Sequence, residues 1–313
     1  MKLVVLMPVY EDWEVVSILL PRLGEVLDQA GHKASLVIVD DGSHTRGEGL
    51  CLPPRGFADG TVVRLRRNLG HQRAICVGLA WVHAHLPGST TIVMDSDGED
   101  DPEDVPRLLA AFSAAGGGKV VFAARRKRSE SLAFRAGYFA YRQLHRLLVG
   151  LPVRVGNFSV LPWNCLRRLV VAEELWNHYA AAVVRGQLPR LELPTHRAHR
   201  LAGGSKMRFV PLVLHGMSAI AVFADVVSIR LLVVGGMVAP VALAVAFASL
   251  ASLSTRPGWM AFAGLASSVA VFQVAILGGM LAVGALAGRR GAGFLPERDA
   301  LAFVDSSESV ASR

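Results

Sequence analysis

Seven of the ten residues from Asp95 to Asp104 are acidic, although the 313-residue chain carries a formal net charge of +8. Such a density of like charge is unfavourable unless a cation or water compensates it. The stretch follows the apolar run Thr91–Met94, which is typical of a buried strand, and open α/β sheets bind ligands at the carboxyl ends of their strands. Asp95, Asp97 and Glu99 alternate, so an extended segment presents them together. Because carboxylate oxygens suit Mg²⁺ or Mn²⁺, we predict a divalent metal site at these three residues.

The second half of the acidic stretch has an ordinary structural explanation. Pro102 favours the first position of a helix, and Asp101 then becomes its N-cap. Glu103 and Asp104 fall in the first turn, where the helix dipole stabilises negative charge. We therefore assign these three acids mainly to the start of a helix. Asp100 stays unassigned between the two groups.

Apolar, β-rich runs alternate with segments of helical periodicity before and after the acidic stretch. The predicted strands are residues 2–7, 35–39, 61–66, 91–94 and 119–124. The predicted helices are residues 13–30 and 71–86, and residues 44–60, which contain two adjacent prolines, are predicted to form a loop. This alternation predicts an α/β fold with a doubly wound, mostly parallel sheet. Polar residues at several strand ends would then meet at one edge.

Arginine dominates the positive charge, and guanidinium groups suit bidentate binding of phosphate. Residues 132–149 have helical periodicity with arginines on one face, which fits either a solvated basic face or an amphipathic helix against anionic lipid headgroups. Residues 197–206 combine cations, two glycines and a hydroxyl, a composition that suits phosphate binding. A merely solvated loop is the alternative there. No zinc-finger spacing or interleaved aromatic pattern favours nucleic acid.

The last third of the chain is more hydrophobic than the rest, and the mean hydropathy of the whole sequence is +0.40. Two uncharged stretches, residues 231–254 and 259–287, each exceed the roughly 20 residues required to cross a bilayer. We expect an amphipathic helix over residues 207–230 before them and a polar tail over residues 288–313 after them. Residues 1–206 then form the domain that carries the acidic stretch.

Positive charge flanks the two predicted spans. Arg230 precedes the first span and Arg289-Arg290 follow the second, while a single arginine lies between them. The positive-inside rule therefore predicts that both termini and residues 1–206 are cytoplasmic. Three scattered cysteines suit reduced thiols in that compartment. Gly284-x-x-x-Gly288 is a pattern that permits membrane helices to associate, here into a homo-oligomer.

Five short motifs occur in the order seen in glycosyltransferase family 2. They are Pro8-Val-Tyr10, Val39-Asp-Asp-Gly-Ser43, Asn68-Leu-Gly70, Asp95-Ser-Asp97 and Arg200-x-x-Gly203-x-Ser205-Lys206. Within that family the chain resembles the polyprenyl-phosphate glycosyltransferases, the dolichyl-phosphate mannose synthase-like group, in the bacterial form with two carboxyl-terminal membrane helices. The resemblance covers about residues 2–290. It implies a GT-A-like catalytic domain on a bacterial inner membrane.

The resemblance also implies a role for each matched position. The residues expected to bind the nucleotide sugar are Pro8, Tyr10, Asp12, Asp40, Asp41, Asn68, Gly70, Asp95 and Ser96. The matched metal ligands are Asp95, Asp97 and Glu99, with Mg²⁺ or Mn²⁺ as the cofactor. The residues expected near the phosphates of donor and acceptor are Arg125, Arg128, Arg135, Arg200, Ser205 and Lys206. The residues expected to act in catalysis are Asp97, Asn157, Arg200 and Lys206.

The chain departs from the family pattern at residues 156–160. Many relatives read GDFRL there, with the aspartate proposed as a base, whereas this chain has Asn157 and replaces the arginine by Ser159. An amide accepts no proton at neutral pH. A polyprenyl phosphate, with a second pKa of about 6, is already mostly dianionic at pH 7, so it needs positioning more than deprotonation. If the acceptor were an alcohol, Asp97 or Asp100 would be the nearest candidate bases.

The expected activity is inverting transfer of one sugar from a UDP- or GDP-linked donor to a polyprenyl phosphate, undecaprenyl phosphate, at the cytoplasmic membrane face. Two alternatives stay open. Gln187-Leu-Pro-Arg190-Leu191 imitates the QxxRW signature of processive polysaccharide synthases, with leucine in place of tryptophan. The loss of the GDFRL aspartate also fits a degenerate membrane scaffold or nucleotide-sugar sensor.

Overall fold

A computed structural model describes most of the chain. The described residues are 1–45, 47, 53–125, 143, 146, 149–150, 155–195, 217–251, 258–288 and 293–311. They belong to two compact units: residues 1–129, 153–222 and 294–313 make the first, and residues 130–152 and 223–293 make the second. The first unit carries a sheet, and the second carries two long helices.

The sheet of the first unit has eight strands in the order β7-β5-β6-β4-β1-β2-β3-β8. The strands are β1 (Leu3–Val9), β2 (Ala34–Asp40), β3 (Phe57–Leu65), β4 (Thr90–Val93), β5 (Val120–Arg125), β6 (Ser159–Leu161), β7 (Arg190–Thr195) and β8 (Val304–Ala311). β1 pairs in parallel with β2 and β4, β2 pairs in parallel with β3, and β5 with β7. β6 and β8 run antiparallel to their neighbours. The predicted doubly wound, mostly parallel sheet is confirmed.

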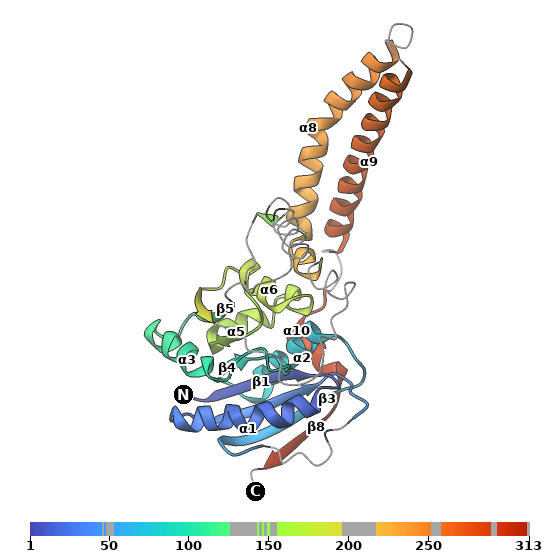
Figure 1. Ribbon diagram of the computed structural model, residues 1–313. Coiled ribbons are helices and arrows are strands. Elements are labelled where there is room, and N and C mark those ends of the chain that lie inside the picture. Colours follow the sequence, from blue (N-terminus) through green and yellow to red (C-terminus); the bar gives the residue numbers. More distant parts are fainter. Residues whose placement is uncertain are drawn as a thin grey trace. The chain divides into compact units, whose positions relative to one another are not determined.

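Helices cover both faces of this sheet. The helices are α1 (Trp13–Gln29), α2 (His71–His85), α3 (Asp104–Ala114), α5 (Trp163–Leu169) and α6 (Tyr179–Arg185). Leu3 and Val5 of β1 belong to the apolar core shared with α1 and α3, whereas Val4 and Leu6 belong to the core shared with α2, α5 and α6. Figure 1 shows α1 on one side of the sheet and α2 on the other. Because β1 is buried on both faces, its sequence is a continuous apolar run.

Two boundaries differ from the sequence prediction. β3 begins at Phe57, inside the predicted loop, so that loop is shorter than expected. α3 begins at Asp104, and Asp101 caps the turn before it, because Asp101 Oδ1 accepts the N–H of Glu103 at 3.2 Å. Asp101 also binds Arg22 on α1 at 2.9 Å. The acids of this half therefore lie at the start of the helix, but the predicted N-cap at Asp101 is wrong, because the N-cap position belongs to Glu103.

The carboxyl-terminal residues return to the first unit and add a strand to its sheet. α10 (Pro296–Asp299) and the 3₁₀ helix η2 (Ala300–Phe303) lead into β8, which pairs with β3. The carbonyl of Phe303 accepts the N–H of Arg66 at 3.0 Å, and its ring lies 5.1 Å from that of Trp176. The structure thus corrects the expectation of a separate polar tail over residues 288–313. Strand pairing satisfies backbone groups without requiring an apolar sequence.

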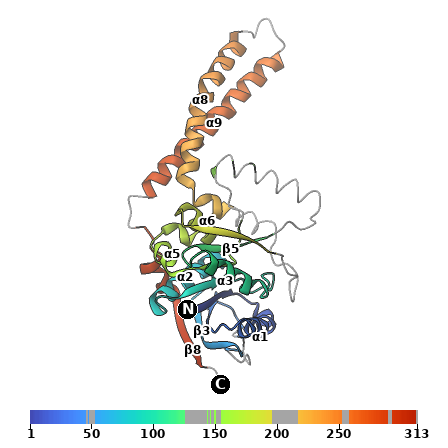
Figure 2. The ribbon, with the colours of Figure 1, turned by 90° about the vertical axis from the view of Figure 1, so that its left-hand side faces the viewer.

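The second unit contains α8 (Ala224–Ala251) and α9 (Gly258–Gly288), which lie side by side in Figures 1 and 2. Segments of 28 and 20 residues in them, with hydropathies of 2.4 and 1.8, are long and apolar enough to cross a membrane. Small residues allow close packing. A Cβ on Gly235 would lie 2.8 Å from the Cβ of Ala275, and Ser268 Oγ donates to the carbonyl of Ala242 at 2.7 Å. These contacts run in opposite directions along the two helices, so the pair is antiparallel.

The limits of these helices differ from the predicted ones. We expected an amphipathic helix to end at Arg230 and the first span to begin after it. In the structure α8 begins at Ala224 and continues through Arg230 without a break. Residues 207–216 of that amphipathic helix lie outside the described residues. Gly284 of the GxxxG pattern has nothing within 4 Å of a Cβ placed on it. Its role in association stays a prediction.

Candidate active site

The acidic stretch and Asn157 meet because β6 runs antiparallel to β4. Asp95 follows the carboxyl end of β4, and Val93 of β4 is opposite Ser159, the first residue of β6. The chain therefore enters β6 at the edge where it leaves β4. β1, β2, β5 and β7 point the same way as β4, so their carboxyl ends lie at this edge too. Open α/β sheets bind their ligands there.

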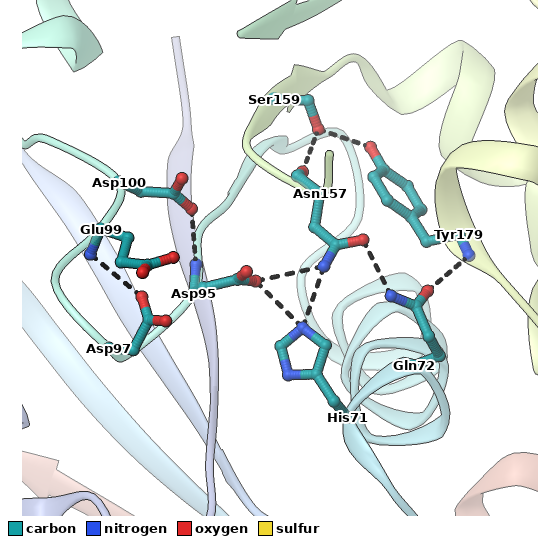
Figure 3. A network of polar contacts seen from close by, with 9 residues as sticks. All are labelled: His71, Gln72, Asp95, Asp97, Glu99, Asp100, Asn157, Ser159 and Tyr179. Carbon is teal, nitrogen blue, oxygen red and sulfur yellow. Dashed lines mark hydrogen bonds and ion pairs between the residues drawn. The ribbon is translucent and has the colours of Figure 1, made fainter. Parts of the chain in front are cut away.

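Two backbone hydrogen bonds fold the acidic loop onto itself (Figure 3). The N–H of Asp95 donates to Asp100 Oδ2 at 3.1 Å, and the N–H of Glu99 donates to Asp97 Oδ1 at 3.0 Å. Asp100 is 3% exposed, so the acid left unassigned by the sequence closes the loop from inside. Gly98, with φ of 77°, supplies the left-handed conformation that this turn requires. The loop leaves Asp95, Asp97 and Glu99 half-buried.

The predicted metal ligands do not form a closed three-carboxylate cluster. Among the residues that the structure describes, no three His, Cys, Asp or Glu side chains are grouped so that they could hold a metal ion. The Asp95 carboxylate points toward His71, away from those of Asp97 and Glu99 (Figure 3). Mg²⁺ commonly takes one or two carboxylates and completes its shell with water and substrate phosphates. Asp97 and Glu99 fit that kind of site, because they offer hard oxygen ligands at the ligand-binding edge.

Asn157 is the centre of a polar network beside Asp95 (Figure 3). Its Nδ2 donates to Asp95 Oδ1 at 3.3 Å and lies 2.9 Å from His71 Nε2. The same His71 nitrogen is 3.0 Å from Asp95 Oδ1. Asn157 is 6% exposed. The position that holds an aspartate in GDFRL therefore holds a neutral group, which hydrogen-bonds the neighbouring acid.

Gln72, Ser159 and Tyr179 support Asn157 from the other side. Gln72 Nε2 donates to Asn157 Oδ1 at 3.0 Å, and Gln72 Oε1 accepts the backbone N–H of Tyr179 at 2.8 Å. Ser159 Oγ, which is 2.7 Å from Tyr179 Oη, donates to the carbonyl of Asn157 at 2.9 Å. Burial raises the pKa of Tyr179, so its hydroxyl stays neutral. Ser159 is thus an internal hydrogen-bonding residue where the family pattern has a cation.

His71 is the histidine that lies beside the acids of this network. Burial by itself would lower the pKa of His71, but the adjacent Asp95, together with Asp97 and Asp100, raises it above its ordinary value. His71 Nε2 lies within hydrogen-bond distance of both Asp95 Oδ1 and Asn157 Nδ2, and the protonation of the ring decides which of the two it bonds. Its side chain remains 42% exposed. The acids of the loop therefore favour positive charge on His71, at the ligand-binding edge of the sheet.

Asp40, at the end of β2, is bonded to protein through both carboxylate oxygens. Oδ1 accepts the N–H of Ser43 at 3.0 Å, and Oδ2 accepts from Arg64 Nη1 at 2.8 Å. Arg64 stands opposite Asp40 on β3. Asp40 is 2% exposed, so the carboxylate of its ion pair with Arg64 is buried. Breaking such a pair leaves an uncompensated charge and is costly.

Asp41 fixes the loop that leads into α2. Its Oδ1 and Oδ2 accept the N–H groups of Leu69 and Gly70 at 2.7 and 2.9 Å. Burial raises the pKa of Asp41 to about 6, although these two N–H groups act in the opposite direction. At Gly42, φ is +73° and a Cβ would lie 2.7 Å from the backbone of Arg67. Glycine is therefore required where these two loops approach each other.

Glu11 joins the loop after β1 to the loop after β2. Its N–H donates to Ser43 Oγ at 3.0 Å, and its carboxylate accepts from Thr45 Oγ1 at 2.9 Å and from the N–H of His44 at 2.5 Å. These bonds hold Glu11 at φ of 53°, a conformation that is uncommon for residues with a side chain. The adjacent Tyr10 is 42% exposed. The loop thereby presents an exposed aromatic ring beside the Asp40-Asp41 turn.

The other predicted site residues fall into four groups. Pro8 is buried in β1, and Ser96 is 7% exposed in the acidic loop. Asp12 directly precedes α1, and Asn68 is exposed on the loop held by Asp41. Arg125 ends β5, but its side chain is not described. The predicted phosphate binders that lie outside the described residues are Arg128, Arg135, Arg200, Ser205 and Lys206.

Several site residues were missed by the sequence reasoning. His71 and Gln72 follow Asn68-Leu-Gly70 directly and begin α2 at the ligand-binding edge. Their position next to a predicted site motif could have identified them as site residues. Arg64 was detectable as a charged residue near the end of a predicted strand. Tyr179 is brought in from α6, far away in sequence, and no local pattern marks it.

Fold and site together define a glycosyltransferase with a GT-A-like fold. Residues 4–163 match the model of the family described as glycosyl transferase family 2, and the chain belongs to that family. Two solved structures share the fold, each with a TM-score of 0.51. Mannosyl-3-phosphoglycerate synthase from Rubrobacter xylanophilus is 13% identical, and the match covers 72% of this chain and 73% of that one. Glucosyl-3-phosphoglycerate synthase from Mycobacterium tuberculosis, in complex with Mn²⁺, UDP and phosphoglyceric acid, is 17% identical with coverages of 72% and 78%.

The curated relatives share one description, undecaprenyl-phosphate 4-deoxy-4-formamido-L-arabinose transferase. The protein from Edwardsiella ictaluri is 30% identical over 220 residues, which cover 67% of this chain and 64% of the relative. The protein from Salmonella paratyphi B is 27% identical over 224 residues, with coverages of 68% and 64%. The chain thus spans about 64% of the length of these relatives.

Proposed function

We propose that this protein is a membrane-anchored, inverting glycosyltransferase that moves one sugar from a nucleotide diphosphate sugar to undecaprenyl phosphate. One observation carries the proposal beyond family membership. The unit with the acidic loop leads into two apolar helices and then takes the chain back as β8. A soluble donor and a lipid-borne acceptor require this combination of site and anchor. The names of the curated relatives support the same acceptor.

The connectivity also supports one orientation. The chain enters the helix pair from the first unit and returns to it afterwards, so a pair that spans the membrane would have both ends on the same side. Arg230 belongs to the beginning of α8, and Arg289-Arg290 follow α9 in the sequence. By the positive-inside rule, that side is the cytoplasm, where nucleotide sugars are made available. We therefore propose that the protein belongs to the inner membrane of a bacterium, with its site at the cytoplasmic face.

In the proposed reaction an acceptor phosphate oxygen attacks the anomeric carbon in line, and the nucleoside diphosphate leaves from the opposite face. The dianionic phosphate needs no base, which fits the neutral, fully hydrogen-bonded Asn157. Asp97 and Glu99 would hold Mg²⁺ or Mn²⁺ against the donor diphosphate. When bound, the cation supplies Lewis-acid stabilisation of the leaving group. His71 and Asp95 line the same edge and fix the loop around it.

Cations must also hold the acceptor phosphate near the donor. The strands β5 and β7 end at the same edge as β4, and the proposed phosphate binders follow those two strands in sequence. They are Arg125, Arg128 and Arg135 after β5, and Arg200, Ser205 and Lys206 after β7. Fixed positive charge of this kind stabilises charge that develops in a transition state.

The processive alternative loses support from the position of its motif. Gln187 and Arg190 are exposed at the start of β7, next to Val120 at the start of β5. They therefore lie at the opposite edge of the sheet from Asp95. Together with two candidate spans among the described residues, this placement favours addition of a single sugar.

A donor panel tests the proposal. Purified full-length protein is mixed with undecaprenyl phosphate, Mg²⁺ or Mn²⁺, and one UDP- or GDP-linked sugar at a time. Lipid products are then separated by chromatography. We expect one donor to give a lipid carrying one sugar. A ladder of longer products would support a processive synthase, and donor binding without any turnover would support a sensor or scaffold.

A further inference from the structure

Gln72 has no assigned role in the site, yet it is buried within it and both ends of its amide are engaged. It is 7% exposed and stands one residue after His71 in the first turn of α2. Its oxygen accepts the backbone N–H of Tyr179, and its nitrogen donates to Asn157. A buried amide satisfied on both ends has a fixed orientation.

The direction of the whole network follows from one backbone group. The N–H of Tyr179 is only a donor, so the Gln72 atom 2.8 Å away must be the oxygen. Gln72 then turns its NH₂ group to Asn157, whose oxygen must accept at 3.0 Å. Asn157 is left with its NH₂ group toward Asp95 Oδ1, at 3.3 Å, and toward His71 Nε2, at 2.9 Å. Rotating either amide by half a turn would set two donors or two acceptors against each other.

We infer that Gln72 is a positioning residue, which holds the NH₂ group of Asn157 toward Asp95 and so fixes the direction of the Asp95 carboxylate. The inference rests on the proposed function only for its activity measurement. Asp95 is held by its backbone to Asp100 and by its carboxylate to Asn157 and His71 (Figure 3). Loss of the Asn157 orientation would present a carbonyl oxygen to that carboxylate. Asp95 would then turn toward the rest of the acidic loop.

Three variants separate this role from simple packing. Gln72→Met keeps the length of the side chain and removes both hydrogen bonds. Gln72→Glu keeps an oxygen for Tyr179 but donates to Asn157 only when its carboxyl is protonated. Burial raises the pKa of such a carboxyl. Gln29→Glu makes the same chemical change at an exposed position near the end of α1 and serves as the control.

We expect Gln72→Met to lower kcat/KM for sugar transfer by about tenfold to a hundredfold at every pH, the range for an unsatisfied buried group. Gln72→Glu should show the same loss at high pH and recover as the pH falls, because protonation restores the donor. In the background of Asn157→Ala, neither change at position 72 should lower activity further. Unchanged activity in both variants, or effects that multiply with Asn157→Ala, would overturn the inference.

A second measurement does not depend on activity, so it still decides if the proposed function fails. Selective ¹⁵N labelling of asparagine gives side-chain NH₂ signals from residues 68, 157, 164 and 177. The Asn157 signal is identified by its loss in Asn157→Ala. We expect Gln72→Met to shift this signal and speed its exchange with solvent, while Gln29→Glu leaves it in place. An Asn157 signal that is the same in Gln72→Met and wild type contradicts the role of Gln72, whatever the enzyme transfers.

Discussion

Two groups of carboxylates lie at the same edge of the sheet but are held in different ways. At the end of β2, Asp40 and Asp41 are each 2% exposed, and all four of their carboxylate oxygens accept hydrogen bonds from the protein. At the end of β4, the side chain of Asp95 is 20% exposed, and Asp97 and Glu99 are half-buried. The same residue type therefore has two uses within one site.

The difference shows which acids build the site and which face the ligand. Asp40 and Asp41 tie the loop after β2 to Arg64 and to residues 69–70. The resemblance assigns both acids to the nucleotide, and that role stays a prediction, whereas their hydrogen bonds show that they shape the surrounding loops. The acids after β4 are left closer to solvent. Substitutions after β2 should therefore change stability first, and those after β4 should change activity first.

The largest expected effect is that of Asp97→Asn. Removing this charge should lower transfer to undecaprenyl phosphate by about 1000-fold, the upper range for a group that stabilises a developing charge. The thermal midpoint of unfolding should stay within a few degrees of wild type. Product formation and thermal unfolding of the purified protein measure the two quantities.

Glu103→Gln is the matched control for this change. Glu103 belongs to the same acidic stretch, but its side chain is 64% exposed at the start of α3. It should retain wild-type activity. If Asp97→Asn is as active as Glu103→Gln, the assignment of the cation to this loop is wrong.

Arg64→Met tests the group after β2. The change leaves Asp40 buried without its ion-pair partner, and we expect a loss of about 3 kcal/mol in the free energy of unfolding. Chemical denaturation of the full-length protein measures it. Arg67→Met, at an exposed residue of the following loop, should cost under about 0.5 kcal/mol. Equal costs for the two variants would show that the buried pair is not part of the framework.

Asp41→Asn tests the acids after β2 through the pH dependence of the free energy of unfolding. The pKa of Asp41 is raised from 3.8 to about 6 by burial, so between these values the folded state binds its proton more tightly than the unfolded state. The stability that this provides is present below about pH 4 and is lost as the pH rises through 6. The free energy of unfolding of wild type minus that of Asp41→Asn should therefore fall by about 2 kcal/mol from pH 4 to pH 6. A difference that does not vary with pH would mean that burial does not raise this pKa.

The sequence predicts the acidic loop after β4, because the patterns that mark this loop lie within a few consecutive residues. An apolar run followed by alternating acids predicts β4 and the positions of Asp95, Asp97 and Glu99. What was missed depends on pairing between distant segments. Asn157 reaches Asp95 because β6 inserts antiparallel beside β4. Likewise β8, a polar edge strand, is held by backbone pairing that hydropathy does not report.

The smallest expected effect, and the sharpest test of the chemistry, is that of Asn157→Asp. If the chain had simply lost a base, restoring the aspartate of GDFRL would raise the rate. The structure predicts the opposite, because the new carboxylate would take the place of an NH₂ group that lies 3.3 Å from Asp95 Oδ1. Two like charges at that distance raise the pKa of the introduced group and turn it away from Asp95. Transfer at pH 8 should fall about tenfold and recover as the pH is lowered.

Asn164→Asp, an exposed position on α5, makes the same chemical change outside the network and should have no effect at either pH. A rate increase in Asn157→Asp with wild-type behaviour in Asn164→Asp would mean that the reaction needs a proton acceptor that this site lacks. A loss that is reversed by acid would mean that position 157 must stay neutral beside Asp95. In that case the acids after β4 position charge, and the acceptor phosphate brings its own nucleophile.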